Sequence, residues 1–408
     1  MKILTNVRFY RIAGIAQTLA NFLEYLQKDS KTKIKVVGVN IVKKGEKQDP
    51  PPQYRTDIFT LYSAVFKYPE IKNAIKNSNN IAEVVEKYHP LIDYYVKIIE
   101  KEKPDLIWIH GTYFLPWCLY LAASRFDIPI VLHYHGVLSW EVKHWEKKFR
   151  IFFQEMEKQF DSDRILYLFP SALTKSVVEK EIFGHPVKNA HILPNGIPEY
   201  FFEKAAGTAK KNDIGFVSRW TFIKNLKFIE KFSKNNLKKG VNPYRIKIIT
   251  DSKLKRNIIR KFDGLANFIK PIKNDLLPEF YQSTKIILCP SYFETYGNVA
   301  QEALACGTPA LINKNMGVAE TYRCLGLDEL IVDFSSTKKL LARLDYYLNY
   351  PIDQKVIDKL KRDFSTTKIF DHLTTIFKDI AEQKNNTPVF TLAVACFQLL
   401  PGLMSFIF

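Results

Sequence analysis

Residues 290–309 read PSYFETYGNVAQEALACGTP, and this stretch decides the predicted fold. The apolar run at 286–289, directly before it, is typical of a buried strand. Gly297 lets the backbone approach a ligand closely, and residues 298–306 have the pattern of a short helix. A strand, a glycine turn and a helix N-terminus form an anion-binding end, because free N–H groups and the helix dipole both point outward.

The same stretch carries two glutamates, Glu294 and Glu302, with seven residues between them. Glu302 lies about one turn into the predicted helix, where a carboxylate can accept hydrogen bonds from sugar hydroxyls. Backbone N–H groups that can bind phosphate, beside a carboxylate that can accept from hydroxyls, suit a nucleotide with its ribose. The alternative is an ordinary α/β turn with two solvated glutamates, which an isolated pair at this spacing would favour.

Outside this stretch, strand-like and helix-like segments alternate, which predicts an α/β fold with parallel sheets and crossover helices. The predicted strands of the first half are 2–5, 33–42, 105–109, 130–134, 164–168 and 190–193. Those of the second half are 213–217, 245–250, 267–269, 285–289, 310–312 and 329–332. Among the predicted helices, the basic and aromatic segment 140–160 suits either a helix that covers a sheet or one that lies on an anionic bilayer.

A cluster of turn-forming residues at 194–198 separates the two series and predicts two doubly wound, Rossmann-like domains. We expect an N-terminal domain over 1–195 and a C-terminal domain over 196–365. Residues 366–386 are expected to form a helix that returns to the first domain. Ligands bind at the carboxyl ends of the strands in such domains, so a cleft between the two is the expected site.

The stretch 290–309 resembles the signature of the retaining glycosyltransferases of family 4, which have the GT-B architecture. The family pattern is E-x7-E followed by A-x-G-x-P, and it is met here by Glu294, Glu302, Ala305, Gly307 and Pro309. The resemblance covers roughly residues 2–380, with its strongest motifs in the second half. It implies two Rossmann-like domains that face each other across a cleft, the first for the acceptor and the second for a nucleotide-sugar donor.

A basic pair, Arg219 and Lys224, follows the first predicted strand of the second half. In the family a pair of this spacing contacts the donor diphosphate, where fixed cations stabilise the charge that grows as the glycosidic bond breaks. Ser218 stands where the family more often has glycine. The alternative is two surface cations in a lysine-rich chain.

In the first half the resemblance points to His135 and Gly14. His135 matches the position that faces the transferred sugar, and a ring nitrogen of histidine can hydrogen-bond a sugar hydroxyl. Gly14 stands where the family usually has a glycine pair near the donor phosphate, and the segment 110–116 is expected near the acceptor. The alternative for His133 and His135 is a strand end with two half-buried rings. A metal held by both is less favoured, since no Cys, Asp or Glu lies nearby in sequence.

The activity that the resemblance implies is transfer of a sugar from a nucleotide diphosphate to an acceptor hydroxyl, with the anomeric configuration retained and no protein nucleophile. Glu294 would contact the transferred sugar, Glu302 the ribose, and Gly297, Asn298 and Val299 the nucleotide. The implied partners are a UDP- or GDP-sugar and a saccharide or lipid-linked acceptor, in cell-surface polysaccharide or glycolipid synthesis. No resident cofactor and no metal are implied.

The motif Asp161-Ser162-Asp163 raises the possibility of the other major glycosyltransferase fold, in which D-x-D holds a divalent metal on the nucleotide sugar. Here the motif precedes a predicted strand instead of following one. We therefore interpret it as the end of a helix and the entry to a strand.

The chain has 408 residues and a net charge of +18, which is unevenly distributed. Residues 204–261 contain 17 Lys and Arg against three acidic residues. Such a field favours nucleotide phosphates, anionic lipid or nucleic acid, unless it is simply a solvated lysine-rich surface. No nucleic-acid module accompanies it, so nucleic acid is not expected. The remaining alternatives are a catalytically inactive GT-B-like partner subunit and an anion-binding protein.

Residues 388–408 carry no charge, and a membrane span needs roughly 20 apolar residues. Pro401 and Gly402 interrupt this run. A tail anchor, a segment packed on the protein and a half-inserted interfacial piece are the three alternatives, and we expect membrane contact. Five scattered cysteines without a C-x-x-C pair suit reduced thiols. The expected location is therefore the cytoplasm, at the inner face of the cell membrane.

Overall fold

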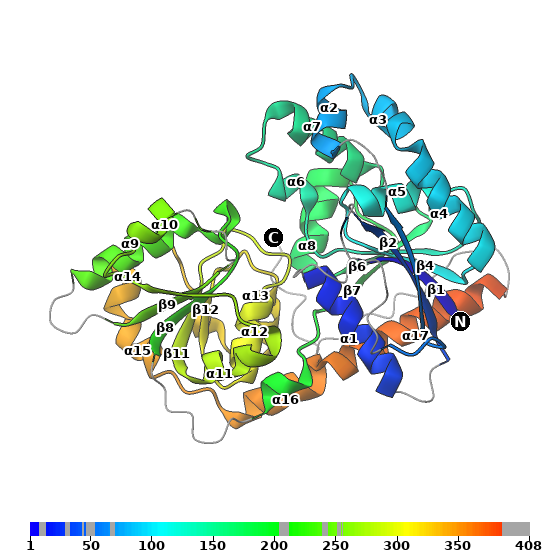
Figure 1. The fold of residues 1–408 in the computed structure, drawn as a ribbon. Coiled ribbons are helices and arrows are strands. Elements are labelled where there is room, and N and C mark those ends of the chain that lie inside the picture. Colours follow the sequence, from blue (N-terminus) through cyan, green and yellow to red (C-terminus); the bar gives the residue numbers. More distant parts are fainter. Residues whose placement is uncertain are drawn as a thin grey trace. The chain divides into compact units, whose positions relative to one another are not determined.

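Two parallel β-sheets, each with packed helices, organise the chain (Figure 1). The computed structural model describes residues 1–7, 14–28, 33–42, 45, 54–65, 70–203, 212–238, 244–250, 254 and 256–385. The chain divides into two compact units. The first comprises 1–170, 174–193 and the C-terminal helix from Phe370, and the second comprises 171–173 and 194–369. The α/β class with two parallel-sheet domains is confirmed.

The first sheet has the strand order β3-β2-β1-β4-β5-β6-β7, and all its pairs are parallel. The strands are β1 (Lys2–Val7), β2 (Lys35–Val42), β3 (Phe59–Val65), β4 (Leu106–His110), β5 (Ile130–His133), β6 (Ile165–Phe169) and β7 (Ala190–Ile192). The strand order reverses between β1 and β4, and such a switch point opens a crevice at the carboxyl ends of the strands.

The helices of the first unit connect these strands. They are α1 (Gly14–Lys28), α2 (Ile71–Lys76), α3 (Ile81–Lys87), α4 (His89–Glu102), α5 (Phe114–Ala123), α6 (Leu138–Glu141), α7 (Lys147–Lys158) and α8 (Ala172–Val177), which continues as a π-helical turn, Val178–Phe183. Helix α17 (Thr366–Asn385) ends the described chain.

Aromatic rings join α1, the centre of the first sheet and α17. Phe22 of α1 meets Trp108 of β4 edge to face at 5.2 Å, and Phe377 of α17 meets the same tryptophan at 5.2 Å. Tyr25 donates a hydrogen bond to Asp371 at 2.7 Å, which adds a polar tie between the two helices. The C-terminal helix therefore belongs to the core of the first unit from Phe370 onward.

The second sheet has the order β10-β9-β8-β11-β12, again with all pairs parallel. Its strands are β8 (Asn212–Val217), β9 (Ile246–Ile249), β10 (Asn267–Ile269), β11 (Thr284–Cys289) and β12 (Ala310–Ile312). Its helices are α9 (Leu226–Leu237), α10 (Arg256–Arg260), α11 (Leu277–Gln282), α12 (Asn298–Ala305), α13 (Val318–Cys324), α14 (Thr337–Ala342), α15 (Leu344–Leu348) and α16 (Gln354–Phe364). The switch point lies between β8 and β11.

Two predicted elements differ in the structure, and one strand of the first sheet was missed. Strand β3 was not predicted, because it is an edge strand whose residues are mostly half-exposed and include Thr60 and Ser63. The helix predicted over 140–160 is two helices, α6 and α7. The strand predicted at 329–332 is a 3-10 turn, Asp328–Leu330, followed by a single bridge from Ile331 to Ile312.

No helix of the described residues combines the length and the apolar character that a membrane span requires. Residues 388–408, on which the membrane prediction rests, lie outside the described residues, as do parts of the basic segment 204–261.

Candidate active site

The loop after β8 carries the predicted basic pair. Arg219 follows the strand within two residues and is exposed, while Lys224 ends a 3-10 turn, Phe222–Lys224. Asn225 then adopts a left-handed conformation with φ of 55°, and its side chain accepts a hydrogen bond from Phe228 N at 3.3 Å. This cap starts α9 and fixes the backbone beside Lys224.

The loop after β11 holds Glu294 through its backbone. Its N–H donates to Asn315 O at 3.2 Å, and its carbonyl accepts from Gly317 N at 3.0 Å, which makes a short parallel bridge. Tyr292 N donates to Ile223 O at 2.8 Å and joins this loop to the loop after β8. The two loops at the switch point of the second sheet are therefore tied to each other.

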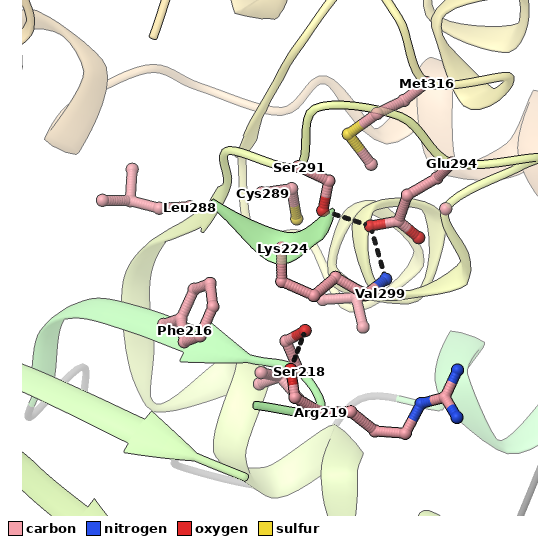
Figure 2. Close-up of a pocket in the computed structure, with 12 residues that line it drawn as sticks. Phe216, Ser218, Arg219, Lys224, Leu288, Cys289, Ser291, Glu294, Val299 and Met316 are labelled. Carbon is pink, nitrogen blue, oxygen red and sulfur yellow. Dashed lines mark hydrogen bonds and ion pairs between the residues drawn. The ribbon is translucent and has the colours of Figure 1, made fainter. Parts of the chain in front are cut away.

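An ion pair lies where these two loops meet (Figure 2). Lys224 Nζ lies 2.9 Å from Glu294 Oε1, and Ser291 Oγ donates to the same oxygen at 2.6 Å. The Lys224 and Glu294 side chains are 17% and 21% exposed, so the pair is partly shielded but can be reached from solvent. Ser291 was not predicted as a site residue, although its place three residues before Glu294 at the end of a strand was a usable signal.

A cavity of about 160 Å³ surrounds the pair. Its lining includes Arg219, Lys224, Glu294, Gly297 and Val299, with the rest supplied by Phe216, Val217, Ser218, Leu288, Cys289, Ser291 and Met316. The guanidinium of Arg219 points to one side of the ion pair instead of toward Glu294 (Figure 2). Five of the predicted site residues thus meet in one cavity of the second unit.

Gly297 is required where it stands, directly before α12. Its φ of 122° is a conformation that L side chains rarely adopt, and a Cβ there would lie 2.7 Å from Met316 Cε. The first N–H groups of α12 follow it, and those groups have no partner within the helix itself. Asn298 is exposed and does not line the cavity, and its Oδ1 accepts from Asn195 Nδ2 at 2.7 Å.

Glu302 lies in α12 but outside the lining of the cavity. Tyr281, which is fully buried, donates its hydroxyl to Glu302 Oε2 at 3.0 Å. Burial raises the pKa of Glu302 to about 7, against the lowering effect of the hydrogen bond from Tyr281. Glu302 lies in the helix that the sequence predicted, 298–306. The desolvation of its carboxylate could not be predicted, because it follows from the packing of other segments around it.

Replacing Glu302 with glutamine is expected to stabilise the ligand-free protein above neutral pH. The folded pKa of about 7 lies above the ordinary value of 4.5. The wild type therefore loses stability as pH rises from 4.5 to 7, where the unfolded chain ionises first. The glutamine variant should be more stable at pH 8 by up to ~3 kcal/mol, a gap that closes near pH 4.5.

Urea unfolding of both proteins across pH 4.5 to 8 measures this gap. Equal stability of the two proteins at every pH would show that Glu302 ionises normally in the folded chain.

In the first unit, His135 follows β5 and contacts the last residue of β4. His110 Nδ1 and His135 Nε2 lie 2.9 Å apart, and the ring of His133 packs at a tilt against that of His135, with centroids 4.3 Å apart. Burial lowers the pKa of all three imidazoles, that of His135 to about 3, so the rings are neutral. Gly14 is the first residue of α1, while the residues before it in the same loop, 8–13, lie outside the described residues.

Among the described residues, these three histidines are the group best arranged to hold a metal ion. One ring nitrogen from each of His110, His133 and His135 lies within 4.8 Å of the others, and imidazole suits transition metals. The group has no carboxylate to balance the charge of a divalent ion in this buried position, which makes binding costly. His110 and His135 are already within hydrogen-bond distance of each other. We therefore interpret the cluster as neutral hydrogen-bonding side chains.

The D-x-D motif is occupied by surface ion pairs. Asp161 Oδ2 lies 2.6 Å from His185 Nε2, and Asp163 Oδ2 lies 2.7 Å from Lys188 Nζ. We expect Asp161→Ala and Asp163→Ala to leave nucleotide-sugar turnover within about twofold of wild type, because substitutions away from such sites usually change little. The assay is run in EDTA and again with added Mg²⁺ or Mn²⁺. A metal requirement that either substitution abolishes would contradict the assignment.

A cation and a carboxylate from the loops that follow two neighbouring parallel strands, beside a helix that begins after a glycine, form an arrangement typical of ligand sites in α/β proteins. Two family models match the chain. Glycosyltransferase Family 4 matches residues 14–199, and Glycosyl transferases group 1 matches residues 199–364. Together the two models show that the chain belongs to the family 4 glycosyltransferases and has their GT-B fold.

Solved structures agree with the fold over almost the whole chain. Sucrose-phosphate synthase from Thermosynechococcus elongatus has a TM-score of 0.72 at 12% identity, covering 94% of this chain and 100% of that one. The α,α-trehalose 6-phosphate synthase of Burkholderia multivorans has a TM-score of 0.66 at 13% identity, covering 94% and 99%. At such identities the likeness shows the fold alone.

Curated relatives match over short segments. A D-inositol 3-phosphate glycosyltransferase of Kribbella flavida is 41% identical over 49 residues, which is 12% of each chain. A protein of the same name from Rhodococcus opacus is 33% identical over 86 residues, covering 21% of this chain and 19% of that protein. The chain thus matches only a small part of the length of these relatives.

Proposed function

We propose that the protein transfers a sugar from a nucleoside diphosphate sugar to an acceptor hydroxyl and retains the anomeric configuration. The observation that carries the proposal is the shared cavity of Arg219, Lys224 and Glu294 at the switch point of the second sheet. Two cations suit a diphosphate, and a carboxylate suits sugar hydroxyls. The glycine-started helix α12 adds backbone donors for phosphate oxygens.

The proposed roles follow the charges. Lys224 and Arg219 hold the diphosphate, and in the ligand-free chain Glu294 compensates the charge of Lys224. When a diphosphate takes over Lys224, the Glu294 carboxylate becomes available to the transferred sugar. Glu302 is assigned to the ribose and His135 to the sugar.

Retention would proceed by attack on the same face that the leaving phosphate occupies, with that phosphate accepting the proton of the acceptor hydroxyl. The bond from the sugar to the phosphate breaks while the bond to the acceptor oxygen forms, so no covalent protein intermediate is needed. The residues named here would then act only by binding, orienting and stabilising charge. We assign no nucleophile.

We propose a saccharide or lipid-linked acceptor, in cell-surface polysaccharide or glycolipid synthesis. The matched relatives are named for D-inositol 3-phosphate, and two of the similar structures are synthases named for sugar phosphates. A phosphorylated polyol or monosaccharide is therefore included among the acceptors to be screened.

The test is a titration of UDP and GDP by calorimetry, followed by donor turnover and an acceptor screen. One of the two nucleotides should bind. A sugar linked to that nucleotide should then be released slowly by hydrolysis or transferred to an acceptor. The configuration of the product at the anomeric carbon, read by NMR, then decides between retention and inversion. Nucleotide binding without turnover of any donor would favour an inactive partner subunit, and absence of binding would reject the donor site.

Membrane association through residues 388–408 is expected at the inner face of the cell membrane. Full-length protein should sediment with vesicles, whereas a chain that stops at Asn386 should stay in solution. If salt alone releases the truncated form, basic residues also contribute, at about 1 kcal/mol for each Lys or Arg near an anionic surface. Equal solubility of both forms at low and high salt would show that the tail does not bind membrane.

A further inference from the structure

One buried carboxylate of the first unit collects four hydrogen bonds. Glu157, in α7, is 0% exposed. Thr112 Oγ1 donates to Glu157 Oε1 at 2.6 Å, as does Leu138 N at 3.0 Å. Ser139 donates to Glu157 Oε2 twice, from its N at 2.7 Å and from its Oγ at 2.6 Å.

These donors come from two different loops. Thr112 lies two residues after His110, the end of β4, whereas Leu138 and Ser139 begin α6, three and four residues after His135. Helix α6 has no capping side chain of its own, and its first N–H groups are satisfied by Glu157 instead. A single carboxylate therefore joins the loop that follows β4 to the loop that follows β5.

Two further contacts join these parts of the chain. His110 Nδ1 and His135 Nε2 lie 2.9 Å apart, and the hydroxyl of Tyr113 donates to the carboxylate of Glu141. Gly136 lies close to the second contact, since a Cβ there would lie 2.5 Å from Glu141 Oε1. His135 therefore lies in a loop with several ties to the end of β4 and the loop after it, and Glu157 is a fully buried member of this set, as are His110 and Thr112.

Burial raises the pKa of Glu157, and the hydrogen bonds from Ser139, Thr112 and Leu138 lower it. The four hydrogen bonds satisfy both the buried carboxylate and its donors, so loss of either side leaves buried polar groups without these partners, which is costly.

We propose that Glu157 is a positioning residue for sugar transfer, which sets the loop carrying His135 against the loop carrying Thr112. The proposal rests on the proposed function, since it acts through His135. Glu157 itself touches no substrate. Loss of its anchoring should lower kcat by misplacing His135, while nucleotide binding in the second unit should stay the same. A misplacement of about 1 Å in a transfer site can cost on the order of 10²-fold in rate.

The test compares Glu157→Gln with Glu155→Gln, an exposed control two residues away on the same helix. Donor turnover is measured per folded active site, with nucleotide affinity and thermal unfolding measured in parallel. For Glu157→Gln we expect kcat to fall at least about tenfold, with nucleotide Kd within about twofold, as a displaced catalytic loop predicts. Glu155→Gln should match the wild type.

Variants that remove one hydrogen-bond donor to Glu157 separate positioning from general stability. They also decide the case if Glu157→Gln does not fold. Thr112→Val removes one donor to the carboxylate, and Thr112→Ser keeps the hydroxyl. We expect Thr112→Val to lower kcat and Thr112→Ser to restore it. Wild-type kcat in a folded Glu157→Gln protein, or in Thr112→Val where Glu157→Gln is unfolded, would overturn the proposal. A wild-type protein that neither binds nucleotide nor turns over a donor rejects the proposed function first, which is a distinct result.

Discussion

Replacing Lys224 with alanine is expected to lower donor turnover by ~10²–10³-fold, the usual cost of one lost preorganised electrostatic contact. Lys224 is the partly shielded cation of the cavity, 17% exposed and 2.9 Å from Glu294. In the proposed reaction negative charge grows on the diphosphate, so Lys224 should stabilise the transition state more than the bound donor. Nucleotide affinity should also fall, because the ground state already carries charge there.

Steady-state turnover of the preferred nucleotide sugar and calorimetry with the matching nucleoside diphosphate measure both losses. Lys227→Ala, an exposed cation in the first turn of α9, is the matched control for the removal of one positive charge. Arg219→Ala should show losses of the same kind. Arg219 is exposed, so the size of the loss of turnover in Arg219→Ala tests whether the guanidinium contacts the bound donor. If Lys224→Ala and Lys227→Ala behave alike, the cavity is not the diphosphate site.

Replacing Glu294 with glutamine is expected to separate binding from transfer. Glutamine keeps the size of the side chain and can still accept from Ser291, but it loses the ion pair with Lys224. Lys224 is then released to a phosphate, so the affinity for free nucleotide should be unchanged or higher. Transfer should fall by about 10²-fold, in the range of a lost charge-assisted contact to the reacting sugar.

The two measurements are the Kd of the free nucleoside diphosphate and the rate of sugar transfer. Glu279→Gln, an exposed carboxylate of α11, is the matched control for the loss of one negative charge. Weaker nucleotide binding together with normal transfer would reverse the assignment and place Glu294 at the nucleotide. Unchanged values for both would remove Glu294 from the site.

The E-x7-E stretch could be predicted to form a phosphate-binding turn because its signals are close together in the chain. The strand 285–289, the glycine turn and a helix from Asn298 all appear in the structure within a residue or two of their predicted bounds. The break inside the predicted helix 140–160 could not be seen. Its apolar spacing continues across both helices, whereas the chain ends α6 at Glu141 and starts α7 at Lys147.

The site was predicted unevenly for the same reason. Arg219 and Lys224 were proposed through the resemblance to family 4, in which a basic pair of this spacing follows a strand, and Gly297 was proposed from its place before a helix. Ser291, Tyr281 and Glu157 could not be assigned, because each acquires its role from a partner. Ser291 bonds Glu294, Tyr281 bonds a glutamate 21 residues away, and Glu157 bonds donors 18 to 45 residues away.

By itself the sequence determined the α/β class, because a strand, a turn and a helix start are encoded within about 20 neighbouring positions, and its motifs led to the GT-B family through their resemblance to it. Only the tertiary structure decided which charges meet. Lys224 and Glu294 are 70 positions apart and pair because β8 and β11 are neighbours across the switch point of their sheet. Likewise, the raised pKa of Glu302 and the four-donor shell of Glu157 exist only once other segments exclude water from those carboxylates.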